Sequence, residues 1–307
     1  MATIVRISTP RPAPFFAPLF VAIDKGFLAE QGLEGVIQYG AGLEGIARGD
    51  VDFTAGMAAY KAFLAGKPVR QICGVSSRES SHVLMARPGI ESPEQLAHIL
   101  IPGGGGNEDQ ERRFITELTN ILALHKLDLL QDEITTRSVP GSHKEQWDML
   151  NDGLGDAATL GAPWSIIAAK AGYRSFGHES NYAPSPSGSG IYCTPKMIAE
   201  REDVVRAFVR AYVKAMRYCM TNVDGTLETL LRYSRDWGVD SLDIARAAYD
   251  EVAPYWRVQV EADVLDRAMR KLCDETGAPR VPVREFLRTE YLDEALANDQ
   301  RKPEGRT

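Results

Sequence analysis

The sequence has 307 residues, of which 44% are hydrophobic and 25% are charged, and its formal net charge is −7 at pH 7. This composition matches an ordinary globular protein and excludes disordered and fibrous chains, and the length suffices for two α/β domains. The acidic balance argues against nucleic acid as a partner, because phosphates require a basic face. A small anionic ligand is compatible with it, since one pocket can be positive within an acidic protein.

No targeting or membrane signal is visible. The first residues, MATIVRISTPRPAPFF, lack the basic region and the apolar core of about 7–15 residues that mark a secretory leader. No apolar run approaches the roughly 20 residues that span a bilayer. We therefore expect a protein that does not span a membrane. As the sequence stands we expect it to be cytoplasmic, or periplasmic or lipid-anchored if a leader peptide was removed.

The four cysteines, Cys73, Cys193, Cys219 and Cys273, lie far apart and form no C-x-x-C pair. This spacing excludes a zinc knuckle and a thioredoxin motif. Apolar settings such as QICGV and GIYCT are typical of packed thiols. HExxH, GxSxG and His–Cys metal spacings are also absent from the sequence. We therefore expect neither a metal nor a cofactor.

Strands and helices are predicted to alternate as far as residue 194, and only helices follow. Strand runs are short and rich in β-branched residues, while glycines and first-turn prolines mark the helix ends. The expected strands cover residues 4–7, 36–39, 51–54, 69–75, 82–88, 134–139, 157–160 and 191–194. The expected helices cover residues 18–25, 27–31, 43–48, 57–65, 108–125, 144–151, 163–171, 202–222, 226–237, 241–252, 261–276 and 286–296.

This order predicts an α/β protein with two domains. Residues 1–90 and 190–307 are expected to form domain I, and residues 91–189 to form domain II. The chain would then cross between the domains twice, near residues 87–92 and 185–191. Two crossings imply two hinge strands and a central cleft, a geometry suited to closure over a ligand.

Four stretches carry a resemblance to a known family. They are PLFVAIDKGFLAEQGLE, the pair ARGDVDFTAG and AGKPVRQICGV, EQWDMLNDGLGDAATLGAPWSIIAAKAGYR, and EREDVVRAFVRAYVKAMRYCMTNVDGTLETL. These resemble motifs of the periplasmic-binding-protein-like family called SsuA/TauA-like or NMT1/THI5-like, and the likeness covers residues 1 to about 230. The resemblance implies the type II periplasmic-binding-protein fold.

The resemblance also implies two classes of function. Most members bind small anions or heterocycles for an ABC importer, so the partners would be a small molecule and, if the protein is exported, an ABC permease. A minority are cytosolic enzymes: a desulfinase, a dihydroxyphthalate decarboxylase and a fungal pyrimidine synthase. The fold alone does not choose between these classes.

The densest polar cluster is SSRESSH at residues 76–82, directly after a predicted strand. Loops at the carboxyl ends of strands are where open α/β sheets bind ligands. Arg78 is expected to hold an acid group in bidentate fashion, and His82 to act as acid or base near pH 7. The alternative is a solvated loop in which Arg78 pairs with Glu79.

Aromatic and glycine-rich loops complete the predicted site. Phe15, Phe16 and Trp164 are candidate walls for a flat ligand, with core packing as the alternative for the two phenylalanines. IPGGGGN before a predicted helix offers backbone N–H groups, although it is neither a P-loop nor GxGxxG. The full set of expected ligand contacts is Arg11, Phe15, Phe16, Gly56, Met57, Ser76, Ser77, Arg78, His82, Gly104, Gly105, Asn107, Gly161, Trp164 and Ser187.

Two hypotheses for function follow. The first is binding of a small acidic or aromatic organic solute in the interdomain cleft by hinge closure. The second is a cofactor-independent cytosolic lyase, such as an aromatic-acid decarboxylase or a desulfinase-like enzyme, with His82 and Arg78 as catalytic residues. Residues 11–16 lack the cysteine that the desulfinase resemblance requires, and GMAAY at residues 56–60 lacks the lysine and histidine of the pyrimidine synthase.

Overall fold

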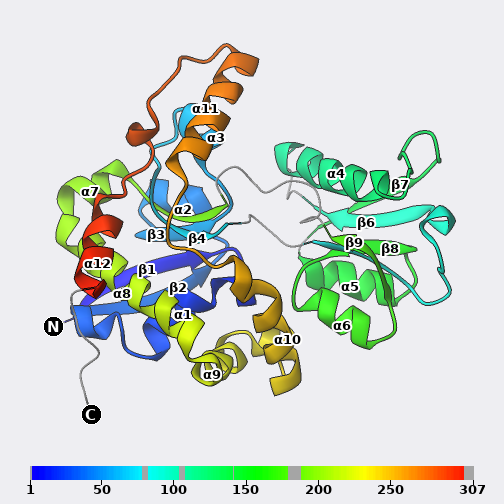
Figure 1. The fold of residues 1–307 in the computed structure, drawn as a ribbon, viewed down its shortest axis with the longest axis horizontal. Helices are drawn as coiled ribbons and strands as arrows, with labels where there is room; N and C mark the ends of the chain where they lie inside the picture. The colour runs from blue at the N-terminus through cyan, green and yellow to red at the C-terminus, as the bar shows by residue number, and fades with distance from the viewer. Residues whose placement is uncertain (1, 78–81, 104–107, 141, 179–187, 301–307) are drawn as a thin grey trace. The chain divides into compact units, whose positions relative to one another are not determined.

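The structure is a computed structural model that describes residues 2–77, 82–103, 108–140, 142–178 and 188–300. The chain divides into two compact units, which are described separately. Unit 1 comprises Met1–Glu79, Ser185–Arg235 and Val252–Thr307, and unit 2 comprises Ser80–Pro184 and Asp236–Glu251. Figure 1 shows the elements of both units. Residues 80–90 and 236–251 lie in unit 2, whereas the sequence pattern predicts them in domain I.

Unit 1 contains a five-stranded sheet in the order β2-β1-β3-β10-β4. The strand β1 pairs in parallel with β2 and β3, whereas β10 lies antiparallel between β3 and β4. The late strand β10 therefore completes a sheet that the first part of the chain begins. The bounds are β1 (Thr3–Thr9), β2 (Leu33–Tyr39), β3 (Phe53–Gly56), β4 (Arg70–Ser76) and β10 (Ser189–Cys193).

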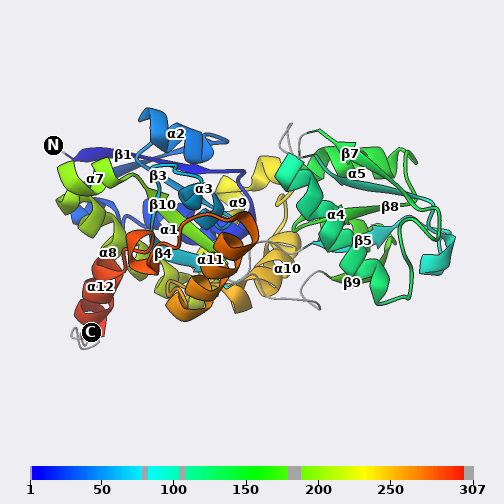
Figure 2. The same ribbon diagram turned by 90° about the horizontal axis from the view of Figure 1, so that it is seen from above.

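Helices surround this sheet, and α8 is the longest of them. Its apolar stripe is buried, and Phe208 stacks on Phe53 of β3 with ring centroids 4.0 Å apart. The helices α1, α8 and α9 lie side by side (Figures 1 and 2). The bounds are α1 (Ala17–Asp24), α2 (Gly42–Arg48), α3 (Tyr60–Leu64), α7 (Pro195–Glu200), α8 (Glu202–Thr221), α9 (Val223–Tyr233), α11 (Ala262–Thr276) and α12 (Glu290–Gln300).

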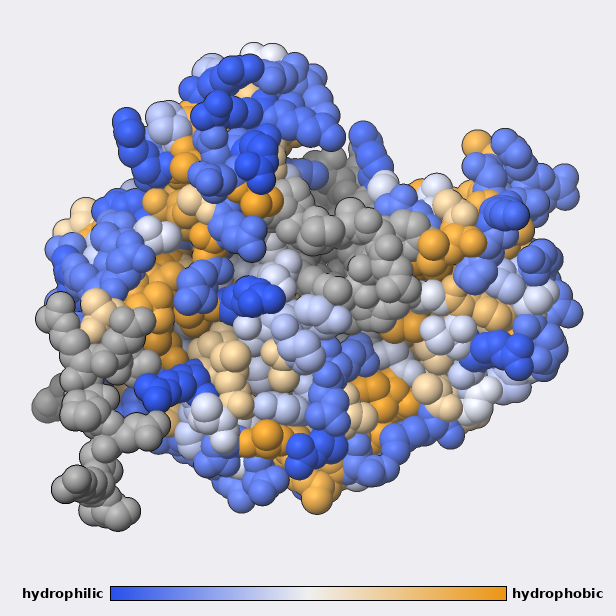
Figure 3. Space-filling model, in the orientation of Figure 1, coloured by the Kyte–Doolittle hydropathy of each residue, from blue (hydrophilic) through white to orange (hydrophobic). Residues whose placement is uncertain are grey.

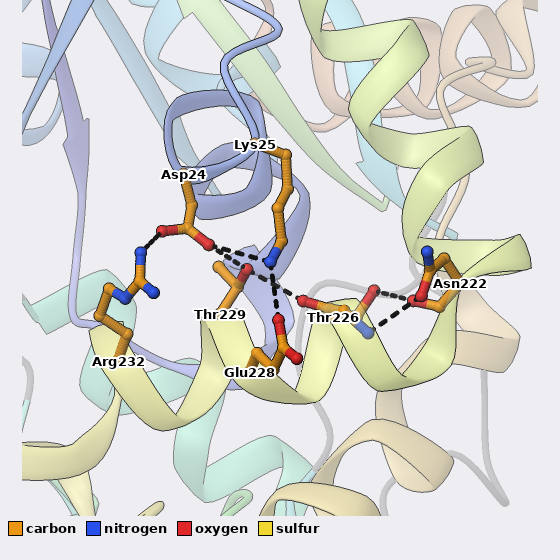
Figure 4. A network of polar contacts seen from close by, with 8 residues as sticks. Asp24, Lys25, Asn222, Thr226, Glu228, Thr229 and Arg232 are labelled. Carbon is orange, nitrogen blue, oxygen red and sulfur yellow. Dashed lines mark hydrogen bonds and ion pairs between the residues drawn. The ribbon is translucent and has the colours of Figure 1, made fainter.

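A polar network joins the end of α1 to α9 (Figure 4). The Asp24 side chain is only 3% exposed and forms an ion pair with Arg232. Thr229 Oγ1 donates to Asp24 Oδ2 at 2.7 Å, and Lys25 Nζ lies 3.4 Å from the same oxygen and 3.0 Å from Glu228 Oε2. The carboxylate is therefore satisfied from both helices, which a buried charge requires.

Unit 2 contains a second five-stranded sheet, in the order β7-β6-β8-β5-β9. The strand β6 is parallel to β7 and β8, while β5 is antiparallel to β8 and β9. Helix α4 covers one face of the sheet, and α5 and α6 cover the other (Figure 1). The bounds are β5 (Val83–Ala86), β6 (His98–Pro102), β7 (Thr135–Val139), β8 (Ala157–Leu160), β9 (Arg174–His178), α4 (Glu108–Ala123), α5 (His143–Asn151), α6 (Trp164–Lys170) and α10 (Leu242–Val252).

Two strands of unit 2 were not predicted. The sequence analysis placed no strand at β6, because HILIP runs into the glycine series, and none at β9, whose sequence RSFGH has no apolar alternation. Further, β5 belongs to the sheet of unit 2 rather than to the sheet of unit 1. The prediction of an α/β fold with two sheets is confirmed by the observed topology.

The surface mixes hydrophilic and hydrophobic residues, as the face drawn in Figure 3 shows. Large exposed hydrophobic residues are spread over several elements, for example Ile4, Val36, Leu130 and Leu242. Single exposed apolar residues of this kind are normal for a globular protein. None of the helices in the described part of the chain combines the length and the apolar character needed to cross a membrane.

Candidate functional site

The strands of unit 1 end at one edge of its sheet. Thr9 at the end of β1 is in register with Tyr39 at the end of β2. Gly190 near the start of the antiparallel β10 pairs with Gly56 at the end of β3, and Ser189 pairs with Ser76 at the end of β4. The loops predicted to bind a ligand in this unit therefore share the carboxyl edge of the parallel strands, which is the usual ligand-binding position.

The predicted contacts of unit 1 differ in exposure. Arg11 is exposed, Phe15, Gly56, Met57 and Ser77 are half-buried, and Phe16 and Ser76 are buried. The rings of Phe15 and Phe16 meet edge to face with centroids 5.6 Å apart. Phe16 therefore packs into the core below, while Phe15 keeps a partly exposed ring at the edge.

Trp256 is a residue at this edge that the sequence analysis did not identify. It is 2% exposed, its Nε1 donates to the carbonyl oxygen of Phe15 at 3.0 Å, and it forms a β-bridge with Ser76. The preceding residue, Tyr255, accepts a hydrogen bond from Ser77 N at 2.8 Å. A segment that lies far along the chain thus fixes two predicted loops, and no local sequence motif marks it.

Unit 2 gathers its predicted residues in the same way. The parallel strands β6, β7 and β8 end at Pro102, Val139 and Leu160. Because β5 runs antiparallel with Val83 opposite Leu160, His82 and Gly161 flank that pair at the carboxyl edge. Gly161 is buried there. The amino ends of α5 and α6 follow β7 and β8 at the same edge.

A glycine is required at the end of β6. Gly103 N donates to Val139 O at 2.7 Å, and a Cβ on Gly103 would lie 2.6 Å from that same oxygen. This close approach of backbones leaves no room for a side chain. The first glycine of the predicted glycine-rich loop therefore serves strand pairing.

His82 forms a buried pair with Glu117 of α4. Its Nδ1 lies 2.7 Å from Glu117 Oε2, and the two side chains are 5% and 9% exposed. The ring of His82 meets Phe114 edge to face at 5.7 Å and His143 at 4.9 Å between centroids. His143 is itself held by Gln146, whose Oε1 lies 2.9 Å from His143 Nδ1.

Trp164 is 6% exposed and packs edge to face against Trp237, with ring centroids 6.0 Å apart. Lys144 Nζ lies 5.9 Å from the Trp164 ring centroid, within cation–π range. Trp164 Nε1 is buried and has no hydrogen-bond partner among the described residues. The indole therefore offers a donor at the edge of unit 2, although its ring is more deeply packed than a free stacking wall.

Five of the predicted ligand contacts lie outside the described residues: Arg78, Gly104, Gly105, Asn107 and Ser187. Their assignment to a ligand site stays a prediction from the sequence.

The four cysteines are all buried, and none of them is in a disulfide bond. Burial raises the pKa of Cys193 and of Cys219 to about 12, and raises that of Cys73 still further. A thiol is nucleophilic only as the thiolate, so these three groups stay protonated and unreactive near neutral pH. No cluster of three or more His, Cys, Asp or Glu side chains suited to a metal ion occurs among the residues that the structure describes.

Two sheets of mixed topology, each with its loops gathered at one carboxyl edge, define the class: the chain has the type II periplasmic-binding-protein fold. Comparison with solved structures supports this class. The alkanesulfonate-binding protein SsuA from Xanthomonas axonopodis pv. citri, bound to MOPS, is similar with a TM-score of 0.68 and 14% identity over 93% of this chain and 98% of that chain.

Two further structures share the fold. The periplasmic nitrate-binding protein NrtA from Synechocystis PCC 6803 has a TM-score of 0.68 and 14% identity over 98% of this chain and 90% of that chain. The desulfurization enzyme DSZB has a TM-score of 0.66 and 16% identity over 97% of this chain and 99% of that chain. A scan against protein-family models and a search of curated proteins find no match. At these identities the likeness establishes the fold and leaves the ligand open.

Proposed function

We propose that the protein binds a small acidic or aromatic organic solute, and that its two units close over this solute. The fold supports the proposal, because similar structures include an alkanesulfonate-binding protein and a nitrate-binding protein. Kinship with the NMT1/THI5-like family, and an ABC permease as partner if the protein is exported, belong to the same proposal. Closure would draw its free energy from contacts that each unit makes with the solute.

One observation carries the proposal: a buried imidazole and a buried indole N–H occur at the carboxyl edge of unit 2. His82 is held against Glu117, and Trp164 Nε1 lacks a partner among the described residues. A buried donor without a partner costs free energy, and an acceptor oxygen of a carboxylate or sulfonate would remove that cost. Phe15 and Ser77 at the edge of unit 1 would contribute an aromatic face and a hydroxyl.

The first prediction concerns Trp164. Thermal unfolding should be followed with a panel of aromatic carboxylates, alkanesulfonates, arylsulfonates and nitrate. A solute at about 100 times its Kd should stabilise the fold by about 2.7 kcal/mol. Trp164→Phe keeps a ring but removes the donor, so calorimetry should show a Kd at least about tenfold weaker, as expected for a lost hydrogen bond to a charged group.

Trp147 provides the matched control. It lies on α5 of the same unit and packs against Tyr173 at 5.0 Å between ring centroids. Trp147→Phe should leave the Kd unchanged. A panel without any stabilising compound would contradict solute binding, and an unchanged Kd in Trp164→Phe would contradict the place of the site.

The second candidate function is a cytosolic lyase that acts on an aromatic acid, and the His82–Glu117 pair favours it. An imidazole bonded to a carboxylate is the arrangement of a general base. Desulfinase-like chemistry through a thiolate is disfavoured, because residues 11–16 contain no cysteine and burial keeps three thiols protonated. The lyase would use His82 to move a proton and Arg78 to hold the acid group.

Turnover separates the two candidates. The tightest aromatic carboxylate from the panel should be incubated with the protein while release of carbon dioxide is measured. Release that His82→Gln abolishes would establish the lyase. Stable binding without release would leave the solute-binding function alone.

A further inference from the structure

The His82–Glu117 pair is distinguished by its burial. Of the residues that the structure describes, His82 is the only histidine and Glu117 the only acidic residue that are buried as whole residues. They are bonded to each other across 35 positions of sequence. The residue that precedes β5 and a residue of α4 thus bring two buried ionisable groups into contact.

Packing does not account for the carboxylate. The inward row of α4 continues with Leu118, Ile121 and Leu122, which belong to the apolar core of unit 2. Glu117 interrupts this row with a group whose burial carries a large desolvation penalty. Replacing a buried ion pair by well-packed apolar residues is often neutral or stabilising. A role in the chemistry of His82 therefore explains Glu117 better than a role in the core.

The bond to Glu117 determines how the imidazole is protonated. An ionised carboxylate has only acceptors, so His82 Nδ1 must carry the proton that joins the two groups. The second ring nitrogen, Nε2, is then the atom at which the imidazole can accept a proton. Phe114 and His143 pack edge to face against the ring and restrict its plane.

We propose that Glu117 is the positioning residue of His82, and that the two form an acid–base dyad in unit 2. Glu117 keeps the proton on Nδ1 and fixes the ring, and Nε2 exchanges a proton or a hydrogen bond with the solute. In a proton transfer, the bond between the solute atom and its hydrogen breaks, the lone pair of Nε2 takes up the proton, and the electron pair of the broken bond stays on the solute atom. The negative charge of Glu117 offsets the imidazolium that forms. The dyad favours solutes with an acidic group at this position.

The direct test is nuclear magnetic resonance of the whole protein labelled with ¹⁵N-histidine. The resonances of His82 are assigned by their loss in His82→Gln. We expect Nδ1 of His82 to carry a proton throughout the folded range of pH, while Nε2 alone changes state. A neutral His82 ring with its proton on Nε2 would overturn the proposal, because Glu117 would then be the protonated partner.

Variants of α4 test the cause. Glu117→Met removes the acceptor at similar volume and should release the Nδ1 proton, whereas Glu117→Asp keeps a carboxylate and should restore the signature in part. Glu111→Met is the matched control on the same helix, since Glu111 accepts a hydrogen bond from Ser138 Oγ at 3.1 Å. Identical spectra for Glu117→Met and wild type would overturn the proposal. The wild-type spectrum decides the matter alone if Glu117→Met does not fold.

The functional half of this inference rests on the proposed solute site, and the protonation half does not. For the tightest acid of the panel, Glu117→Met should weaken the Kd about tenfold or more, with no change in Glu111→Met. A dyad seen by resonance without any bound solute would contradict only the proposed function. If a solute binds and its Kd is the same for Glu117→Met and wild type, only the role of the dyad is contradicted.

Discussion

His82 and Glu117 lie 2.7 Å apart, Nδ1 to Oε2, and the neighbours of Glu117 on α4, Leu118 and Ile121, belong to the apolar core. Removing one member of a buried ion pair leaves an uncompensated polar group, whereas replacing both members by apolar residues is often neutral or stabilising. Replacing both residues by apolar ones should therefore leave the free energy of unfolding nearly unchanged while solute binding is weakened. This result would distinguish a pair retained for chemistry from one retained for folding.

The second prediction follows from this contrast. Glu117→Met alone should lower the free energy of unfolding by about 3–5 kcal/mol, and adding His82→Leu should restore most or all of that loss. Urea denaturation of both variants measures the effect. Solute binding should stay weak in the double variant. A double variant less stable than Glu117→Met would contradict this account of the pair.

Sequence reasoning found one member of the pair and missed the other. His82 stands at the end of a dense polar loop, SSRESSH, which marks it locally. Glu117 lies in EDQERRFITELTNILA, where it is one of several acidic residues on an amphipathic helix. Nothing local separates it from Glu111, because its burial comes from tertiary contacts such as the one with His82. Trp256 was missed for the same reason, since its partner Phe15 is remote in sequence.

At the scale of elements, one carboxylate carries the polar part of the contact between α1 and α9, beside the stacked rings of Phe20 and Tyr233. The Asp24 side chain is 3% exposed and is bonded to Thr229 and Arg232 of α9 (Figure 4). Its cationic partners are more exposed, with 20% for Lys25 and 66% for Arg232, so water can solvate them if the carboxylate is lost. Most of the cost should therefore come from the buried hydrogen bond of Thr229.

The third prediction is that Asp24→Asn lowers the free energy of unfolding by about 1.5–3 kcal/mol, the range for a hydrogen bond to a charged group. Asp274→Asn is the control. Asp274 pairs with Arg280 at side-chain exposures of 57% and 65%, and such a surface pair should change stability by less than about 1 kcal/mol. Equal effects of the two substitutions in chemical denaturation would contradict the structural role of Asp24.

Elements with a local signal were predicted, and those without one were not. The strands β1, β3 and β4 and helix α8 follow from apolar runs, glycine stops and a long apolar stripe. The strand β6 pairs in parallel with β7 and β8, so no hairpin turn marks it, and Pro102 at its end suggested a loop. The edge strand β9 contains Gly177 and pairs with β5 alone.

At the scale of the whole molecule, buried thiols should lower the free energy of unfolding at alkaline pH. The pKa of the Cys193 and Cys219 thiols is raised by burial to about 12, whereas a thiol in the unfolded chain has a pKa of about 8.5. Between these values the unfolded chain loses protons that the folded chain keeps. Each such thiol should therefore lower the free energy of unfolding by about 1.4 kcal/mol for each pH unit above about 9.

The fourth prediction tests this with Cys219→Ala. Urea denaturation from pH 7 to pH 11 should show a steeper fall for the wild type than for the variant above about pH 9. Between pH 7 and pH 8 the Cys219 thiol is mostly protonated in the folded and in the unfolded chain. The free energies of unfolding of wild type and variant should therefore change in parallel over this range. Parallel curves over the full range would mean that Cys219 is not shielded in the folded protein.

The two-sheet α/β fold could be predicted, because its strands and helices alternate in the first part of the sequence. The assignment of residues to units was harder to predict. The helix α10 lies in a run of helices that otherwise belongs to unit 1, yet residues 236–251 belong to unit 2, where Lys170 pairs with Asp243. The return of the chain to unit 2 at these residues is determined by tertiary contacts and cannot be recognised from the composition of the sequence.

The position of β10 has a consequence for synthesis on the ribosome. This strand fills the place between β3 and β4, yet it is made only after residues 77–188. At about 5–20 residues per second, the sheet of unit 1 stays open for on the order of ten seconds while most of unit 2 emerges. We expect stalled nascent chains that end before residue 189 to show rapid hydrogen exchange in β3 and β4, and chains that extend beyond residue 193 to show protection. The first unit to begin emerging would thus be the second to finish folding.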